Sequence, residues 1–211
     1  MTSRQAVIKR SLDLLSAVVL LLLFGWLLLL CWLIASIETR SQGIFAQRRI
    51  GRFGQPFWVY KIKTMHDATG ERSSITASCT GAITRSGRLF RRFKLDELPQ
   101  LWNVLRGQMS LVGPRPDVPG YADLLQGEAR LILQLRPGIT GPASIKYRHE
   151  ETLLSAVPDA QAYNDKVIWP DKVRINLAYY RHYSLGLDLL CLAATLVPSL
   201  AERLNRRFEA C

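Results

Sequence analysis

Acidic residues are few in this sequence compared with basic ones. The 17 Asp and Glu residues stand against 28 Lys and Arg residues, which gives a formal net charge of +11. A surplus of this size indicates an anionic partner: a nucleic acid, an anionic membrane surface or a phosphorylated substrate. Charge alone leaves all three open. The length of 211 residues fits one domain with a small additional element.

Cysteine and histidine are also scarce, and neither is arranged as a set of metal ligands. No two cysteines form a C-x-x-C pair, which argues against a zinc site or a disulfide framework and fits a reducing compartment. The histidines lack H-E-x-x-H spacing, so each is interpreted as an ordinary surface or core residue. These residues are Cys31, Cys79, Cys191, Cys211, His66, His149 and His182.

Motifs for nucleotides and nucleic acids are absent as well. The sequence has no G-x-G-x-x-G and no G-x-x-x-x-G-K-[ST], so the usual phosphate-cradling loops are missing. It also lacks a zinc-finger or RNP motif. We therefore expect no nucleic-acid partner.

Charge is missing altogether from one segment near the N-terminus. Residues 14–35 are uncharged and mostly apolar. At about 1.5 Å per residue, a helix of this length could cover the roughly 30 Å hydrocarbon core of a bilayer. No small-x-small cleavage site follows, so a membrane anchor is favoured over a cleavable signal peptide.

Basic residues lie on both sides of this segment. The positive-inside rule places basic flanks in the cytoplasm, so the helix either re-enters through the same leaflet or spans the membrane with one flank dominant. Gly25 is a candidate bend point, although no proline occurs between Thr2 and Gln55. We predict a re-entrant helix and keep a spanning helix as the alternative. The flanking residues are Arg4, Lys9, Arg10, Arg40, Arg48, Arg49 and Arg52.

The remaining sequence predicts an α+β, mostly helical fold. Short strands at 44–49 and 57–65 predict a β-hairpin, and the polar stretch 66–86 predicts a loop. Apolar spacing predicts helices over 88–106, 121–135, from 170 onward and over 185–200. The last of these precedes a basic stretch, which fits an amphipathic helix at a membrane interface; a buried core helix is the alternative.

Two adjacent carboxylates, Asp96 and Glu97, interrupt a strongly basic region. Alone they would be interpreted as helix-capping residues worth about 0.3–1 kcal/mol. Surrounding cations favour a site for phosphates, because guanidinium groups bind phosphate oxygens bidentately. Cations also lower carboxylate pKa values, so one carboxylate could attack phosphorus while the other holds a hard cation such as Mg²⁺. The cations are Arg85, Arg88, Arg91, Arg92, Lys94, Arg106 and Arg115, the last on the proline-rich loop 111–120.

The order of four motifs resembles the small monotopic phosphoglycosyl transferases, also called bacterial sugar transferases. The motifs are KIKTM, KLDELPQLWNVLRGQMSLVGPRP, RPGITG and YYRHYSLGLDLLCLAATL. The resemblance runs from about Lys9 to Leu196. It implies transfer of a sugar 1-phosphate from a UDP-sugar to a polyprenol phosphate, usually undecaprenyl phosphate, with release of UMP. The product would start a surface glycan such as exopolysaccharide, O-antigen or a glycoprotein.

The resemblance also implies roles for individual residues. Asp96 would be the nucleophile that forms a covalent phosphosugar intermediate, and Glu97 would act with Asp96 at a Mg²⁺ ion. Substrate contacts would come from Lys63, Arg91, Arg115 and Arg136. Residues 1–38 would be the membrane helix, and residues 39–211 a catalytic domain on the cytoplasmic face of the bacterial inner membrane. One departure is that the family's Ser-Pro break in the membrane helix is replaced by Gly25–Trp26.

Two other functions fit these residues less well. A non-catalytic scaffold that binds anionic membrane lipids would explain the charge and the anchor, but gives no reason for Asp96 and Glu97 among cations. A nucleic-acid-binding protein would explain the charge but not the uncharged N-terminal segment. A homodimer formed through the apolar C-terminal helix is a further expectation.

Overall fold

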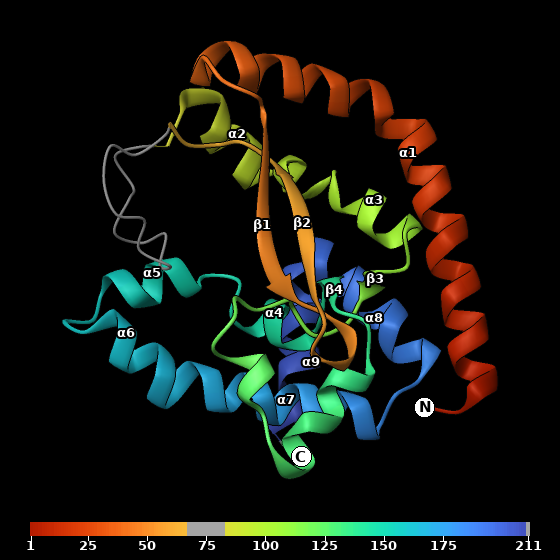
Figure 1. Ribbon diagram of the computed structural model, residues 1–211. Coiled ribbons are helices and arrows are strands. Elements are labelled where there is room, and N and C mark those ends of the chain that lie inside the picture. Colours follow the sequence, from red (N-terminus) through yellow and green to blue (C-terminus); the bar gives the residue numbers. More distant parts are fainter. Residues whose placement is uncertain (67–82, 210–211) are drawn as a thin grey trace.

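The computed structural model describes residues 1–66 and 83–209, and it is mostly helical with two small sheets (Figure 1). The α-helices are α1 (Ser3–Thr39), α2 (Arg85–Arg92), α3 (Gln100–Leu105), α4 (Pro142–Lys146), α5 (Glu150–Ser155), α6 (Ala160–Tyr163), α7 (Trp169–Arg181), α8 (Leu185–Leu196) and α9 (Pro198–Glu209). Shorter helical turns are η1 (Arg52–Gly54), η3 (Leu95–Glu97), η4 (Ala122–Leu124), η5 (Gly127–Gln134) and η6 (Asn164–Ile168). The strands are β1 (Ile44–Ile50), β2 (Pro56–Ile62), β3 (Ser110–Val112) and β4 (Gly138–Thr140). The predicted mostly helical α+β fold is confirmed.

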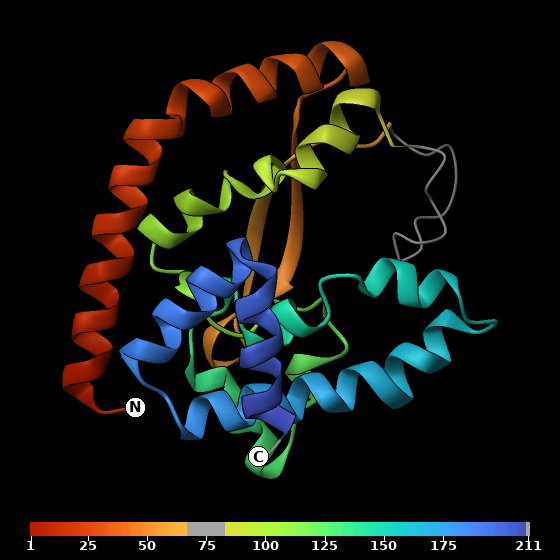
Figure 2. The ribbon, with the colours of Figure 1, turned by 180° about the vertical axis from the view of Figure 1, so that it is seen from behind.

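Helix α1 begins at a capping box and bends along its course. Thr2 accepts a hydrogen bond from the backbone of Gln5, and the Gln5 side chain accepts one from the Thr2 backbone. The helix ends at Arg40, which has a left-handed conformation. Figures 1 and 2 show that its N-terminal part runs along one side of the molecule and its C-terminal part crosses above α2 and α3. Gly25 is not required by packing, since a Cβ there would meet no atom within 4 Å.

Most of the α1 surface is left uncovered by protein. Within the described part of the chain, α1 is the one helix long and apolar enough to cross a membrane, and only 11% of its most apolar window is buried. Ala17, Cys31 and Ala35 pack against the body, whereas Leu22 and Trp26 are exposed. A narrow stripe of α1 therefore contacts the protein, and the rest is an exposed apolar surface of the kind that marks an interaction site.

The predicted β-hairpin is confirmed. Strands β1 and β2 pair antiparallel, with Ile44 opposite Ile62 and Ile50 opposite Pro56. Strand β2 ends three residues earlier than predicted, and Met65 instead forms an isolated bridge with Ile83. Most of the predicted loop at 66–86 lies outside the described residues.

The predicted helix over 88–106 is wrong as a single element. It is divided into α2, η3 and α3, because Lys94 adopts a left-handed conformation with φ of 57°. Pro99, which has no N–H to donate, then lies at the start of α3. The predicted helix over 121–135 is likewise replaced by the two 3₁₀ turns η4 and η5, and Gly127, the first residue of η5, has a positive φ. The first interruption determines the position of Asp96 and Glu97.

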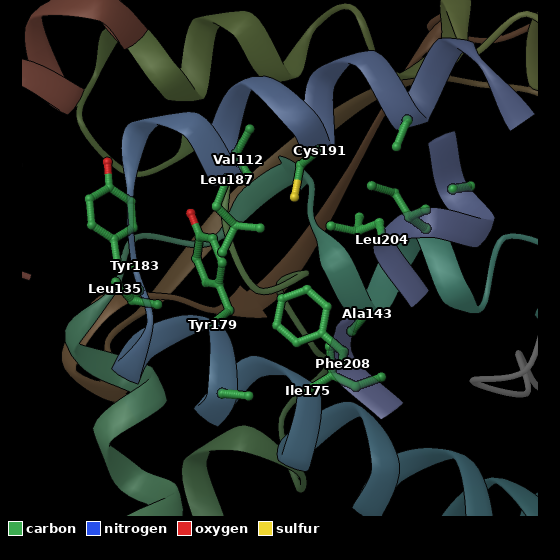
Figure 3. Packing of buried hydrophobic residues seen from close by; sticks show 14 residues of the cluster. Val112, Leu135, Ala143, Ile175, Tyr179, Tyr183, Leu187, Cys191, Leu204 and Phe208 are labelled. Atoms are coloured by element: carbon green, nitrogen blue, oxygen red, sulfur yellow. The ribbon is translucent and has the colours of Figure 1, made fainter. Parts of the chain in front are cut away.

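The C-terminal region forms the largest core cluster of the described chain. Figure 3 shows side chains of α8 and α9, among them Leu187 and Phe208, meeting Tyr179 of α7. The single helix predicted over 185–200 is interrupted before Pro198, so α8 and α9 fold against each other. One face of α8 therefore lies in the core, which is the alternative left open above. Leu189 and Leu196 of the same helix are exposed. Its membrane-interface position and a homodimer stay predictions.

Candidate active site

Asp96 and Glu97 lie in the short turn η3, between α2 and α3. Lys94 interrupts the helix after α2, and η3 then brings both carboxylates against β2. Only 8% of Asp96 and 7% of Glu97 is exposed, although charged side chains are rarely buried without partners. Successive residues of a 3₁₀ turn point in directions about 120° apart, so the two carboxylates face different surroundings.

Glu97 is held by two cations from different parts of the chain. Its Oε1 accepts hydrogen bonds from Lys61 Nζ at 3.1 Å and from Arg115 Nη2 at 2.8 Å. Lys61 belongs to β2, and Arg115 to the loop after β3. Burial alone would raise the pKa of Glu97, but Arg115 and Lys61 outweigh it, so this pKa is lowered, as predicted. Glu97 is therefore an ionised anchor that fixes two cations.

Asp96 has the opposite electrostatic balance. Its Oδ1 is buried and has no hydrogen-bond partner within residues 1–66 and 83–209. Burial and then repulsion from Glu97 raise the pKa of Asp96, while Lys61 and Lys94 act against the rise. The lowered pKa predicted for this residue is wrong, because burial exceeds the attraction of the cations. A buried oxygen without a partner costs about 1–3 kcal/mol, which suits an atom reserved for a ligand or a reaction.

The four predicted substrate-binding cations do not gather at one place. Arg115 contacts Glu97, and Arg91 is close enough to lower the pKa of Asp96. Lys63 donates to Ser41 Oγ at 2.6 Å, beside the end of α1. Arg136 donates to the Gly107 carbonyl at 2.9 Å, beyond the other end of α3.

Three residues of this region were not predicted. Lys61 lies two residues before the predicted Lys63, and the packing of β2 against η3 brings it to Glu97. Burial and repulsion from Arg115 lower the pKa of Arg49 to about 10, and burial raises the pKa of Asp117 to about 6. Asp117 could have been suspected, since it follows the predicted Arg115 by two residues in the same loop.

Asp96 and Glu97 offer only two carboxylates to a metal ion. In the described ranges, no three or more His, Cys, Asp and Glu side chains gather in a way that could hold a metal ion. Mg²⁺ commonly takes only one or two protein carboxylates and completes its shell with water and substrate phosphates. The unpartnered Asp96 Oδ1 next to the Glu97 carboxylate fits that requirement.

Comparison with known proteins gives one consistent result. A family model described as bacterial sugar transferase matches residues 4–202. The UDP-glucose:undecaprenyl-phosphate glucose-1-phosphate transferase of Caulobacter vibrioides is 36% identical over 91% of this chain and 69% of its own length. A protein of Bacillus subtilis (strain 168), named uncharacterized sugar transferase EpsL, is 33% identical over 90% of this chain and 85% of its own length. The UDP-N-acetylgalactosamine-undecaprenyl-phosphate N-acetylgalactosaminephosphotransferase of Aeromonas hydrophila is 31% identical over 90% of this chain and 43% of its own length.

Proposed function

Because the chain belongs to the bacterial sugar transferase family, we propose that it transfers a sugar 1-phosphate from a UDP-sugar to a polyprenol phosphate such as undecaprenyl phosphate. Two of the relatives described above carry the names of such reactions, with glucose and N-acetylgalactosamine as the sugars. The observation that carries the proposal is the unpartnered, buried Asp96 oxygen beside the Lys61–Glu97–Arg115 ion pairs. The product would start the assembly of an exopolysaccharide, O-antigen or glycoprotein glycan.

The reaction would proceed in two displacements at the same phosphorus. In the first, the Asp96 carboxylate attacks the phosphorus that bears the sugar, and the bond to UMP breaks as UMP leaves. In the second, a phosphate oxygen of the polyprenol phosphate attacks that phosphorus, and the bond to Asp96 breaks. The carboxylate is thereby restored, and the sugar ends on a polyprenol diphosphate.

The residues around Asp96 supply what these displacements require. Lys61, Lys94 and Arg91 oppose the rise in the pKa of Asp96 and so favour the ionised nucleophile. Arg115 is oriented by its bond from Nη2 to Glu97, and its other donors are geometrically suited to phosphate oxygens. Mg²⁺, held by Asp96 and Glu97, would neutralise charge on the diphosphate.

We further propose that α1 re-enters the cytoplasmic leaflet of the bacterial inner membrane, with residues 39–211 as the catalytic domain in the cytoplasm. Support comes from contacts at both ends of α1 with the same body. Near its start, Lys9 Nζ bonds to Asp188 Oδ2 at 2.7 Å, and near its end Glu38 Oε1 accepts from the Arg85 backbone at 2.8 Å. A straight spanning helix would instead separate its ends by about 30 Å of hydrocarbon.

Trapping of the covalent intermediate tests the reaction. The full chain, purified in detergent with Mg²⁺, would be incubated with UDP-sugars labelled in the sugar, without any polyprenol phosphate. We expect the label to stay on the peptide that contains Asp96 after denaturation, with one UMP released per label. The Asp96→Asn variant is the matched control and should retain no label. Absence of label with every donor, from a folded chain, would favour the lipid-binding scaffold instead.

A further inference from the structure

A second cluster of cations lines a cavity beyond the other end of α3. The cavity has a volume of about 330 Å³, within the range of roughly 300–1,000 Å³ common for small-ligand pockets. The first turns of α1 form one wall, and the segment before β4 forms the other. Three arginines line it, Arg10, Arg52 and Arg136, and we call this site the basic cleft.

Backbone carbonyls, rather than carboxylates, hold these three arginines in place. Arg10 Nη2 donates to Leu105 at 3.2 Å, Arg52 Nε to Gln134 at 2.8 Å and Arg136 Nε to Gly107 at 2.9 Å. The bonds of Arg52 and Arg136 use Nε and leave the paired terminal nitrogens for other acceptors. Arg10 Nη1 is buried and has no hydrogen-bond partner in the part of the chain that the structure describes.

The charge of the basic cleft is poorly compensated. Asp13 is the one carboxylate among the described residues that line it, and its Oδ1 also accepts from the Leu111 backbone at 3.0 Å. Lys9, which lines the cavity too, is paired with Asp188. Burial and then repulsion from Arg136 lower the pKa of both Arg10 and Arg52, so these cations are placed within reach of one another. An anion placed among them would relieve this repulsion.

Apolar side chains beside the basic cleft indicate that this anion carries hydrocarbon. Phe53 at the hairpin tip is 59% exposed, and Arg52 lies 4.5 Å from the centre of its ring. Phe53 also adopts a positive φ of 60°, which is an unusual conformation for an aromatic residue. Its ring is exposed in this conformation. On α1, Val7 and Leu12 are exposed just before the uncharged segment. Apolar side chains such as Phe and Leu beside basic ones are typical of segments that lie at the membrane–water boundary.

The basic cleft is separate from the candidate active site. Asp96 lies before the first residue of α3, whereas Leu105 and Gly107, which hold Arg10 and Arg136, lie at and after its last residue. A phosphate bound by these arginines would not be the one that reacts at Asp96. The acceptor is therefore a weaker candidate for this site than a resident lipid.

We propose that the basic cleft binds the phosphate headgroup of an anionic phospholipid, with the acyl chains along the exposed face of α1. The three guanidinium groups would hold the phosphate oxygens, and Phe53 and Val7 would contact the upper part of the chains. The site rests on the membrane attachment proposed above but not on the transfer reaction. It would fix the depth and orientation of the catalytic body at the bilayer surface.

Native mass spectrometry of the full chain in a neutral detergent tests this site. The protein would be mixed with equal amounts of phosphatidylglycerol, which is anionic, and phosphatidylcholine, which is zwitterionic, with identical acyl chains. We expect one phosphatidylglycerol to be retained preferentially, and retention to fall about tenfold in Arg52→Gln and in Arg136→Gln. Arg48→Gln, at an exposed arginine of β1, is the matched control and should retain the lipid as the unmodified chain does. Equal retention by all four proteins would overturn the proposal.

Two further arms distinguish other sources of phosphate. Millimolar inorganic phosphate should leave the lipid bound, because it lacks the apolar contacts; complete displacement would identify a site for free phosphate instead. In a transfer assay, Arg52→Gln should leave the KM for polyprenol phosphate unchanged. A raised KM with unchanged lipid retention would assign the cleft to the acceptor. Failure of the transfer reaction itself would leave the lipid measurement intact, so the two proposals can fail separately.

Discussion

The two basic regions at opposite ends of α3 differ in the groups that hold their cations. At the candidate active site, Lys61 and Arg115 share the buried carboxylate of Glu97. In the basic cleft, Arg10 and Arg136 are held by carbonyls, which carry no net charge. A shared carboxylate fixes cations and balances them, so the site is stable before substrate arrives. Carbonyls fix cations without balancing them, so the cleft favours an added anion.

The largest effect should come from Asp96, whose buried Oδ1 has no hydrogen-bond partner among the described residues. We expect Asp96→Asn to reduce UMP release at least ~1,000-fold, because an amide cannot act as the nucleophile. Its melting temperature should be unchanged or higher, since burial and the neighbouring Glu97 carboxylate disfavour the negative charge that the variant removes. Product assays combined with thermal unfolding check both parts. Substantial turnover by this variant would exclude Asp96 as the nucleophile.

The next effect concerns Glu97, whose loss should make the active site resemble the basic cleft. Glu97→Gln leaves Lys61 and Arg115 without their shared carboxylate, at a cost of about 1–3 kcal/mol after allowance for the partial exposure of both cations. We also expect a rate decrease on the order of 100-fold, because Lys61 and Arg115 would lose the orientation that the proposed binding of a diphosphate requires. Glu97→Asp is the matched control, since it keeps the charge with a shorter side chain.

The stability difference between wild type and Glu97→Gln should depend on pH. The pKa of Glu97 is lowered in the folded chain from an ordinary value of 4.5, so its contribution is complete well above pH 4.5 and is lost as the pH falls below it. Urea unfolding at pH 7 and pH 4 measures this. We expect the gap between the two proteins to narrow at pH 4. A constant gap would show that Glu97 stabilises through packing instead of charge.

Arg115 provides a smaller test, of geometry rather than charge. Arg115→Lys keeps a cation opposite Glu97 but loses the planar pair of donors. We expect KM for the UDP-sugar to rise about tenfold with a melting temperature within a few degrees of wild type. The same change at Arg91, whose ion pair with Glu151 is 3.3 Å long and more exposed, should have less effect. Equal effects at both positions would remove the special role given to Arg115.

Much of the fold and the centre of the site could be predicted from sequence, for identifiable physical reasons. Uncharged residues 14–35 predict an apolar helix by composition, and the β-hairpin follows from strand-forming residues around a turn. The division of 88–106 was not predictable, because the left-handed conformation falls on Lys94, a residue type that rarely adopts it. Lys61 and the basic cleft depend on pairing between distant segments. Arg136 was assigned to the substrate from its motif, whereas its position beside Arg10 requires the folded chain.

The smallest effect on stability should come from Arg52, the most peripheral cation of the basic cleft. Arg52→Gln loses the bond to the Gln134 carbonyl but also removes repulsion toward Arg136, so the net change should stay within about 0.5 kcal/mol. Screening by salt should then separate the two proteins. Raising NaCl from 50 mM to about 500 mM shortens the Debye length and should stabilise wild type more than the variant. Salt should stabilise Glu97→Gln at least as much as wild type, because Lys61 and Arg115 lose their shared carboxylate in that variant. If wild type and Arg52→Gln respond equally to salt, the arginines of the cleft do not repel one another strongly enough to require an anion.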